Sequence, residues 1–499
     1  MKIPFYLKLA NVVHDGWCQQ EAYGIRFDRE AAEKLLPMVD ARMEELEQSV
    51  EPRLPKTELN KGEQKAVTPP ARQFNKSTGK PSVYAERFFD DLVETYDGSW
   101  FGVKDGKKYP LPVPVKPLYT GGPMRLKHQQ NLKQWLMDEY GWKPTFWNYK
   151  KVKDEHGKLR PVRVKGQLVK NSPKFHENGK LCPNLEVLGE MQGIVKEIIE
   201  WLSLKNRRAV IKTKDPKKNT GWLNNCRLDA DGRLSPRHSG LTNTKRAKHT
   251  EVANVPRPSS TLGKEMRGLF IASPGKVLVG YDASSLEARV KGHYTAKYDG
   301  GQYAEKILAD GYDEHESNAI LWFWDKAKRR DAKTPGYALQ YFCGLPTFAR
   351  AIGMSQEEAA PKYEAYWEEN WALKEFDEAV AQYWRDHGER YVVLIDGSRV
   401  YTRSRHSVTN AVMQGTGAKV MDLSYVFMRK WVSRLRERGH SINRVVYYHD
   451  EYMYECDPEI AQKVGELGCK SIVQAGKYFK MRVPLAAEYK VGNSWAEVH

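Results

Sequence analysis

The sequence predicts an α/β protein with several subdomains, in which amphipathic helices pack around short apolar strands. Two runs, "KVLVGYD" (276–282) and "RVVYY" (444–448), have the length and composition of buried strands. The segment "EMQGIVKEIIEWLSLKNRRAVI" (190–211) instead carries apolar residues at helical spacing. A chain of 499 residues is long enough to bury more than one core.

The charge balance favours a polyanionic partner. The chain has 80 Lys and Arg against 63 Asp and Glu, a net charge of +17, which is typical of proteins that bind nucleic acid or anionic membranes. No apolar run approaches the length of a membrane span, and the first residues lack the pattern of a secretory signal. The six cysteines never stand at C-x2-C spacing, which argues against zinc fingers and fits reduced thiols. Nucleic acid is therefore the expected partner, and a membrane is not.

The N-terminal third contains two predicted helices, one irregular segment and the start of one predicted hairpin. A helix is predicted over 28–50, kinked or interrupted at Pro37. Residues 51–125 are rich in Pro, Lys and polar groups with little periodicity, which predicts an insertion with mobile parts. A second helix is expected within 123–144, and a basic hairpin that turns at His156-Gly157 within 150–170.

Carboxylates stand at the ends of both apolar strands. Asp282 closes the first strand, and Glu287 lies in the helix predicted to follow, for which Ser284 is a plausible cap. Asp450 and Glu451 follow the second strand, where neighbouring carboxylates repel each other and are costly to bury. Asp282 could simply cap the helix, and the acidic pair could be a solvated hairpin tip, an edge-strand device or a surface pair. A catalytic interpretation requires a cation that offsets the repulsion.

A third pattern lies between these two strands. In "RRDAKTPGYALQYFCG" (329–344), Arg329, Lys333, Tyr337 and Tyr341 recur every four residues and would form one stripe on a helix. Two cations followed by two aromatic rings suit a triphosphate at one end and a base at the other. The alternative is a surface stripe whose tyrosines pack on the core.

Together these segments resemble motifs A, B and C of family A, the polymerase-I-like DNA polymerases. The matching stretches are "DASSLEAR" (282–289), "RDAKTPGYALQY" (330–341) and "HDE" (449–451). The resemblance runs from about Trp17 to His499. Within the family, the sequence is most similar to the replicative polymerases of short-tailed bacteriophages. Further stretches that carry it are "AYGIRFDREA" (22–31), "EVANVPRP" (251–258) and "RHSVTNAVMQGTGA" (405–418).

The resemblance implies a right-hand fold, with an antiparallel-sheet palm, helical fingers and a helical thumb. The thumb would span 1–225 and include the insertion at 51–125. The palm would comprise 226–294 and 410–499, and the fingers 295–409.

The resemblance also implies roles for individual residues. Asp282, Asp450 and the Ala283 backbone carbonyl would hold two Mg²⁺ ions, with Glu451 a weak further candidate, and Arg329 and Lys333 would assist catalysis. The residues implied in nucleotide binding are Glu287, His315, Arg329, Lys333, Tyr337 and Ala283. The residues implied in DNA binding are Tyr341, Asn410, Gln414, His449, Lys245 and Arg246.

Two departures from the family pattern stand out. The usual Thr-Gly-Arg is replaced by Thr242-Asn243-Thr244, so the cation shifts to Lys245 or Arg246. Pro335 stands inside the presumed motif B helix, where a proline removes a hydrogen bond and costs about 3 kcal/mol. The helix would therefore kink there or begin near Thr334.

The function implied by the resemblance is template-directed DNA synthesis from dNTPs on primer-template DNA, in replication of a phage genome in the cytoplasm of the infected bacterial host. The alternatives are a single-subunit RNA polymerase and a catalytically inactive DNA-binding clamp. The family commonly carries a 3′–5′ exonuclease ahead of the thumb, and here the thumb resemblance starts almost at once, so we expect no intrinsic proofreading. The D-x-E at Asp28 to Glu30 is interpreted as a helix start, and the acids Glu86, Asp90, Asp91 and Glu94 as the solvated face of a short helix. A separate exonuclease subunit, and a processivity factor docked at 51–125, are further expected partners.

Overall fold

The chain forms two compact units in the computed structural model. The first comprises Met1–Leu36 and Arg207–His499, and the second Pro37–Asn206. The thumb predicted for 1–225 therefore falls into both units, and its boundaries remain a prediction. None of the described helices is both long and apolar enough to cross a membrane. The structure describes residues 3–58, 61–119, 121–155, 157, 159–164, 167–177, 180–213, 220–226 and 232–499.

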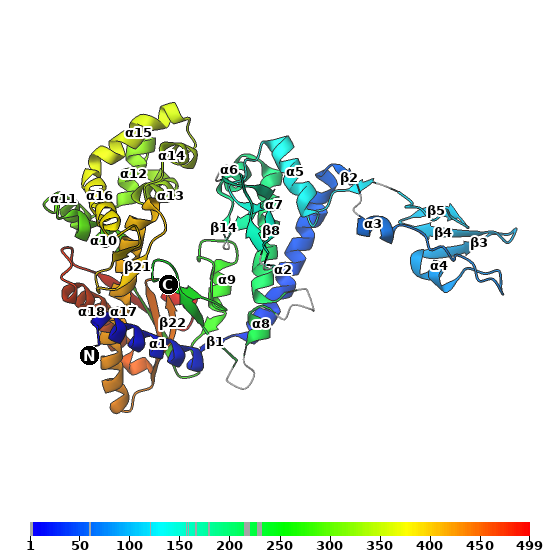
Figure 1. Cartoon of the computed structure of the whole chain (residues 1–499). Helices are drawn as coiled ribbons and strands as arrows, with labels where there is room; N and C mark the ends of the chain where they lie inside the picture. The colour runs from blue at the N-terminus through cyan, green and yellow to red at the C-terminus, as the bar shows by residue number, and fades with distance from the viewer. Residues whose placement is uncertain are drawn as a thin grey trace. The chain divides into compact units, whose positions relative to one another are not determined.

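A four-stranded sheet is the centre of the first unit (Figure 1). The strand order is β22–β23–β19–β24, and each neighbouring pair is antiparallel. The antiparallel sheet predicted from the sequence is therefore confirmed. Its strands are β19 (Val277–Ala283), β22 (Ile442–Tyr448), β23 (Glu451–Cys456) and β24 (Ala487–Gly492).

The two faces of this sheet pack against different helices. On one face, the Tyr452 hydroxyl donates a hydrogen bond to the Met421 carbonyl of α17 (Val408–Glu437) at 3.0 Å. Tyr281 lies on the same face against Gly468 of α18 (Ala461–Tyr478), where an added Cβ would stand 2.4 Å from the tyrosine ring. The other face holds Met453 against α19 (Trp495–Val498). Each face thus has its own apolar core.

The N-terminal helix α1 (Phe5–Tyr23) belongs to this unit and packs against α17 and β22. Beside it, a buried ion pair joins Arg233 to Glu455 at 3.0 Å, and the Tyr23 hydroxyl donates to the same carboxylate. Since a buried charge is costly unless it is paired, this network fixes the start of the chain onto β23. Arg233 belongs to a three-stranded sheet in the order β15–β1–β18. Its strands are β1 (Ile25–Phe27), β15 (Arg233–Leu234) and β18 (Phe270–Ile271).

Helices between β19 and β22 complete the first unit. The helix that carries the cation-aromatic stripe, α13, begins at Arg329 and continues through Pro335, so the alternative start near Thr334 is wrong. Tyr341 directly follows the helix and donates its N–H to the Tyr337 carbonyl at 3.2 Å. The main helices here are α10 (Leu286–Thr295), α11 (Gln302–Leu308), α12 (Glu314–Phe323), α13 (Arg329–Gln340), α14 (Leu345–Ile352), α15 (Gln356–Glu369) and α16 (Trp371–Asp386).

The second unit is built on helices of which the sequence predicted α2, α5 and α7 but not α6. The helix α2 runs unbroken through Pro37, so the predicted interruption is wrong. It is tied to α7 by an ion pair between Arg42 and Glu200 at 2.8 Å and by Trp201, which donates to Glu47 at 2.9 Å. The helices are α2 (Arg29–Val50), α5 (Gln129–Tyr140), α6 (Pro183–Met191) and α7 (Gly193–Ile211).

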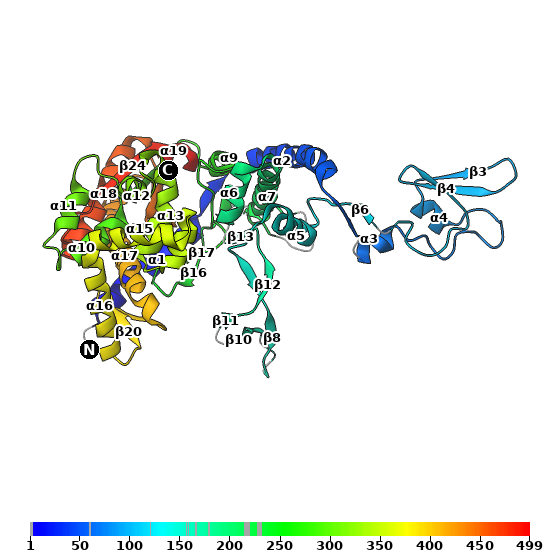
Figure 2. The same cartoon turned by 90° about the horizontal axis from the view of Figure 1, so that it is seen from above.

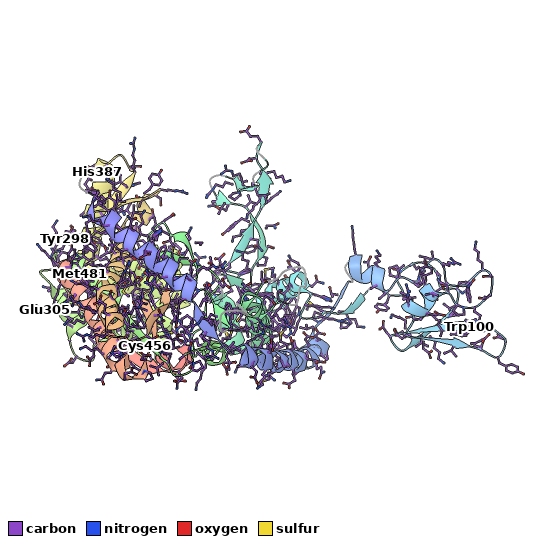
Figure 3. All side chains as sticks on the ribbon, turned by 90° about the horizontal axis from the view of Figure 1, so that it is seen from below. Trp100, Tyr298, Glu305, His387, Cys456 and Met481 are labelled. Atoms are coloured by element: carbon purple, nitrogen blue, oxygen red, sulfur yellow. The ribbon has the colours of Figure 1, made fainter. Side chains whose placement is uncertain are left out.

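The insertion at 51–125 is more regular than the sequence predicted. Strands β2 (Lys56–Glu58) and β6 (Gly121–Pro123) pair at its base, and a three-stranded sheet with Trp100 lies in its outer part (Figure 3). Phe89 packs under Gly102 and gives this part a small core. The acids expected on one helix are dispersed, because Glu86 lies in α4 whereas Asp91 and Glu94 lie in β3. The outer elements are α3 (Lys61–Ala66), α4 (Val83–Phe88), β3 (Asp91–Glu94), β4 (Trp100–Lys104) and β5 (Lys107–Pro110).

Besides the insertion, the second unit contains a ribbon of short strands at 147–173 (Figure 2). The hairpin predicted within 150–170 lies in this ribbon. Strands β7 and β12 pair at its base, and β8–β9 and β10–β11 form two hairpins beyond them. The turn residue His156 lies outside the described residues. The strands are β7 (Trp147–Tyr149), β8 (Lys151–Lys153), β9 (Leu159–Pro161), β10 (Arg163–Val164), β11 (Gln167–Leu168) and β12 (Lys170–Pro173).

Candidate active site

Four carboxylates meet at one end of the central sheet. Asp282, near the end of β19, is paired across the sheet with Glu451 of β23 and with Glu488 of β24. Cross-strand partners lie on the same face, so these three side chains are neighbours. Asp450 stands in the turn before β23, and its carbonyl accepts a hydrogen bond from the Ala283 N–H at 3.3 Å. The structure therefore brings together the two strand-end aspartates that the sequence singled out.

The helix-cap interpretation of Asp282 is wrong. Asp282 belongs to β19, and the N-cap residue of α10 is Ser285 rather than the predicted Ser284. Ser285 has a left-handed φ of 50° and makes no capping side-chain hydrogen bond. Asp282 is therefore not engaged in ending or starting a helix.

The hairpin interpretation is correct in position, and Asp450 is exposed, but Glu451 of the same acidic pair is buried. His449 and Asp450 are the two residues of the turn between β22 and β23, and His449 has a φ of 60°. A left-handed φ is uncommon for residues other than glycine, and such strain often marks functional sites. Solvent reaches the Asp450 side chain, yet protein surrounds it on its other sides, and this burial raises the pKa of its carboxyl.

The acidic cluster is electrostatically unfavourable when no cation is bound. Burial, followed by the charge of Asp450, raises the pKa of Asp282 to about 6. The charges of Glu488 and Glu451 act in the same direction. A cluster of this kind lowers its free energy by binding a proton or a cation. Carboxylate oxygens are ligands that Mg²⁺ prefers, so the donor set fits this ion.

Glu451, the weak metal candidate, is already engaged elsewhere. One carboxylate oxygen accepts from Trp495 Nε1 at 3.0 Å, and the other lies 3.0 Å from His499 Nδ1. The side chain is 5% exposed. Through these two contacts Glu451 ties the C-terminal helix to the site, and its role as a metal ligand stays a prediction.

Of Lys245 and Arg246, the two cations that follow the Thr242-Asn243-Thr244 segment, Arg246 is the one that reaches the site. Its guanidinium donates to Glu287 at 2.9 Å, and its charge counters the rise in the Asp450 pKa. Arg246 lies in the hairpin of β16 (His238–Leu241) and β17 (Ala247–His249), where its carbonyl accepts from the Thr242 N–H at 2.7 Å. Lys245 occupies the turn with a φ of 63°, and its N–H donates to the Thr242 carbonyl at 3.1 Å.

The stripe on α13 faces a group of cations and rings. Arg329 pairs with Asp313 at 2.6 Å, and the rings of His315 and Tyr337 meet edge to face with their centroids 5.2 Å apart. Burial lowers the pKa of Lys333, and the charges of Arg257 and Arg329 lower it further. The predicted residues are therefore gathered in one place, which the surface-stripe alternative does not require.

Among the buried side-chain polar atoms that lack a hydrogen-bond partner in the described part of the chain, three belong to predicted site residues: His315 Nδ1, Tyr341 Oη and Asn410 Oδ1. An unsatisfied buried group costs about 1–3 kcal/mol, so a ligand or water that bound these atoms would relieve this cost. Gln414, one turn after Asn410 on α17, lies beside the Tyr341 hydroxyl without reaching hydrogen-bond geometry.

Sequence reasoning missed several members of this site. Glu488 becomes a neighbour of Asp282 only through the register of β24, which no local pattern encodes. Arg257 acts on the pKa values of Lys333 and Tyr337, and its place in "EVANVPRP" is the signal that would have found it. His249, whose ring meets that of His449 at 5.1 Å, carried no comparable signal.

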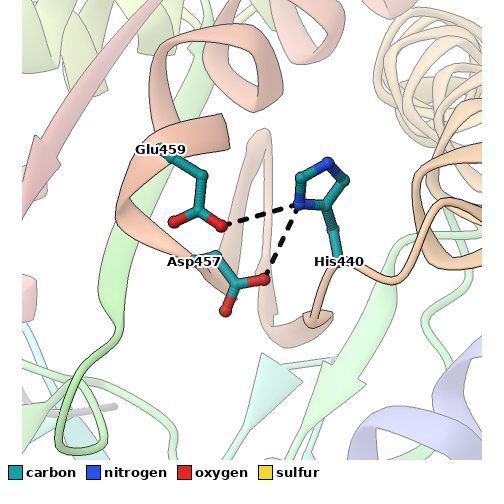
Figure 4. A group of neighbouring side chains, drawn as sticks. All are labelled: His440, Asp457 and Glu459. Carbon is teal, nitrogen blue, oxygen red and sulfur yellow. Dashed lines mark ion pairs between the residues drawn. The ribbon is translucent and has the colours of Figure 1, made fainter.

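A second cluster, His440 with Asp457 and Glu459, lies elsewhere in the same unit (Figure 4). His440 Nδ1 is 3.9 Å from the Asp457 carboxylate and 3.7 Å from that of Glu459. Asp457 already accepts hydrogen bonds from Lys276 and from the Ser441 N–H. With its carboxylate engaged by a cation, we assign no metal to this cluster.

Comparisons with known proteins agree with this geometry. The family model "DNA polymerase family A" matches residues 166–497. The DNA-directed DNA polymerase of Enterobacteria phage T3 is 26% identical over 362 residues, covering 65% of this chain and 50% of the relative. That of Escherichia phage T7 is 27% identical over 339 residues, covering 62% and 46%. The chain thus spans half or less of the length of these relatives.

A solved structure shares the fold. The POL domain of Pol1 from M. smegmatis, in complex with a DNA primer-template and dNTP, has a TM-score of 0.65 and 17% identity, covering 97% of this chain and 70% of that one. At this identity the likeness concerns the fold, and it confirms the predicted polymerase right hand. The extent of the family match decides the classification: this chain belongs to DNA polymerase family A.

Proposed function

We propose that this chain catalyses template-directed DNA synthesis, in which a primer 3′-OH attacks the α-phosphate of a dNTP and pyrophosphate leaves. The observation that carries the proposal is the meeting of Asp282 and Asp450 at one sheet end, with the cations of α13 in the same unit. The names of the phage relatives and the DNA and dNTP in the solved relative support it.

The two aspartates and the Ala283 carbonyl would hold two Mg²⁺ ions. When bound, magnesium lowers the pKa of the primer hydroxyl and neutralises charge on the phosphates. The raised pKa of Asp282 supports this assignment, because a nearby cation relieves the repulsion that helps to raise it. Glu488, as an exposed neighbour, adds negative charge that strengthens cation binding.

Arg329, Lys333 and His315 would bind the triphosphate. Arg329 pairs with Asp313, so a phosphate would replace or share this partner through a charge-assisted hydrogen bond. Tyr337, packed against His315, would stack beside the nucleotide sugar and base. The cations would thereby orient the α-phosphate toward the primer end.

Glu287 would exclude ribonucleotides by occupying the space of a 2′-hydroxyl. Its ion pair with Arg246 holds the carboxylate in one orientation, as a steric wall requires. Tyr341 would lie near the template base, and Asn410, Gln414, His449 and Arg246 would contact the minor groove and primer end, with Lys245 in the adjoining turn. Minor-groove acceptors are alike in every correct pair, so these contacts would check pair geometry rather than sequence.

Primer extension tests this function. The purified chain should extend a matched primer with the four dNTPs and Mg²⁺, and should use the four rNTPs far more slowly. Efficient ribonucleotide addition would instead support the RNA polymerase alternative. Primer-template binding without any extension would support an inactive clamp and overturn the proposal.

We also propose a role in phage genome replication, in which proofreading is supplied by another polypeptide. The D-x-E near the N-terminus supports this division, because Asp28 accepts the Ala31 N–H at 2.9 Å and Glu30 pairs with Lys34. Both acids thus serve the start of α2 rather than a nuclease site. These 499 residues alone should leave a mismatched 3′ end intact, and excision that survives Asp450→Asn would contradict this.

A further inference from the structure

We propose that the ribbon at 147–173 binds the phosphate backbone of duplex DNA without reading its sequence. The proposal rests on the proposed function in naming DNA as the substrate, and adds a contact site that lies mostly outside the family match, which starts at residue 166. It concerns binding alone, so it is testable without the chemical step.

The ribbon concentrates positive charge. Residues 147–173 contain eight Lys and Arg but only two acidic residues. A nucleic-acid backbone is the common cellular partner for such a segment, since each phosphate contact releases a counterion. The cations that the structure describes are all exposed: Lys150, Lys151, Lys153, Arg160, Arg163 and Lys170.

The ribbon has no apolar core of its own. None of the described residues from 147 to 172 is buried, and Val152, Leu159 and Val164 are 51–60% exposed. Its strands are joined by main-chain hydrogen bonds that meet at one point, from Lys150 to Val169 and from Val162 to Lys150. An isolated two-stranded ribbon is marginally stable in water, so a surface that it contacts would also order it.

Three lysines in or next to β8 are free of ion pairs with the described acids. Lys150, Lys151 and Lys153 form none with any acid that the structure describes. By contrast, Arg160 pairs with Asp154 at 2.9 Å, and Lys170 lies over the Trp147 ring at 4.7 Å. The three lysines are therefore available to phosphates without first breaking an ion pair.

The composition favours duplex over single-stranded DNA. Proteins that bind single strands stack bases on aromatic side chains, and the aromatic residues of the ribbon are Trp147 and Tyr149 in β7 at its base, where Lys170 lies over the Trp147 ring. A two-stranded ribbon also has the dimensions of the major groove. Lysines reach phosphates as point charges and carry no base code, so we expect contacts that are independent of sequence.

The insertion at 61–119 offers a matched control. It has ten Lys and Arg against seven acids, and a small core around Phe89. Lys76, Lys107 and Lys108 are exposed, as the ribbon lysines are. The triple variant K76Q/K107Q/K108Q therefore removes the same charge from the same unit, but from a part that we do not expect to bind DNA backbone.

The experiment compares K150Q/K151Q/K153Q with that control by fluorescence anisotropy on duplex and single-stranded DNA, across a salt series without dNTP. The ribbon variant should bind duplex DNA about tenfold or more weakly at low salt, and its slope of log affinity against log salt should fall by about 2 to 3. The control should lie near the wild type. Lys→Arg at the same three ribbon positions should restore both quantities, which separates lost charge from lost folding.

Equal slopes for the ribbon variant and its control would overturn the proposal, as would a loss confined to single-stranded DNA. Arginine variants that fail to restore binding would show that the effect is structural and would also overturn it. Failure of the proposed function is distinct: the wild type would bind duplex DNA with the predicted slope but extend no primer. Single-nucleotide addition at saturating DNA should be unchanged in the ribbon variant.

Discussion

The sheet-end site and the ribbon place charge in opposite ways. At the site, burial and the like charges crowded around Asp282 together raise the pKa of that carboxyl to about 6. In the ribbon, cations are exposed and solvated, and no core fixes them. The site therefore depends on each carboxylate individually, whereas the ribbon depends on the sum of its charges.

The surrounding structure explains this difference. Asp282 lies in a strand paired on both sides, and its sheet is packed on both faces. Its carboxylate is thus held in place before any ligand binds, as catalysis by preorganised groups requires. The ribbon lysines have rotamer freedom and would lose it on binding, so each contributes only a share of the affinity.

The most severe test removes one carboxylate from the site. Asp282→Asn or Asp450→Asn should lower primer extension by about a hundredfold to a thousandfold or more, the range seen when a preorganised charged group is lost. Primer-template affinity should change little, because most of it comes from phosphate contacts. Steady-state extension in Mg²⁺ with anisotropy on the same DNA measures both.

Two controls sharpen this contrast. Asp457→Asn changes an acid next to a strand end in the cluster of Figure 4 and should leave extension within about twofold of the wild type. Lys151→Gln changes one ribbon charge and should weaken DNA binding only slightly. Near-normal turnover of Asp282→Asn or Asp450→Asn would contradict this contrast between the site and the ribbon, because the carboxylates would then be structural.

A smaller effect is expected from Glu287→Ala. Removal of the carboxylate frees space for a 2′-hydroxyl and releases Arg246 from its 2.9 Å ion pair. Ribonucleotide incorporation should rise about tenfold to a hundredfold relative to dNTP incorporation, as expected when a site loses a specific steric or polar element. The ratio of kcat/KM for rNTP and dNTP is the measurement.

Glu287→Gln is the matched control for this test, because it keeps the bulk of the side chain and removes only its charge. A steric wall predicts that the glutamine variant stays close to the wild type in its rNTP to dNTP ratio, whereas the alanine variant does not. Equal ratios in all three proteins would remove Glu287 from this role.

The sequence predicted those parts of the site that carry a local pattern. Asp282, Asp450 and the α13 stripe each follow an apolar strand or a helical spacing, so their positions were readable. Glu488 was not, because its proximity to Asp282 depends on which strand pairs beside β19. The contacts of Glu451 were not predicted for a related reason: its partners, Trp495 and His499, come from a later segment that folds back onto the sheet.

The fold was predicted less well at Pro37 of helix α2 and where strands are short. Helix α2 was recognised from its periodicity, but its continuity through Pro37 was not, since packing against α7 outweighs the missing hydrogen bond. The three-stranded sheet in the insertion was missed because strands of four or five residues with few buried side chains leave little alternation to detect. The packing of Phe89 under Gly102 is not a periodic signal either.

A stability measurement tests the electrostatics of the site without catalysis. The pKa of Asp282 is raised in the folded protein from an ordinary value of 3.8 to about 6. The stability that this group contributes is therefore fully present below about pH 3.8 and lost as the pH rises through about 6. At pH 8 and without metal, Asp282→Asn should be more stable than the wild type, by less than about 3 kcal/mol because solvent partly screens the group.

Thermal unfolding in EDTA at pH 5 and pH 8 makes this measurement. The gain in Tm from Asp282→Asn should be larger at pH 8, and Mg²⁺ should then stabilise the wild type more than the variant. A matched change in the ribbon, Lys151→Gln, should leave Tm nearly constant at both pH values because that side chain is exposed. A variant that is less stable than the wild type at pH 8 would mean that Asp282 is not under repulsion.

The smallest effect is expected from removal of the outer insertion. Its base is closed by the pairing of Thr57 with Gly122, so residues 61–119 are removable with a short linker that keeps β2 and β6 together. We propose that this part docks a processivity partner, since its charges are nearly balanced and it has its own small core, unlike the ribbon. A tethered partner raises the effective concentration of the polymerase on its template.

Deletion should therefore leave single-nucleotide addition intact and shorten the products of one binding event about two- to threefold, chiefly when host extract is present. The ribbon variant should shorten them without extract as well, because its contact is with the DNA itself. Product-length distributions under single-turnover trapping distinguish the two. If the deletion leaves product length unchanged with and without extract, the insertion is a tolerated addition. The ribbon alone would then add DNA contacts to those of the sheet-end site.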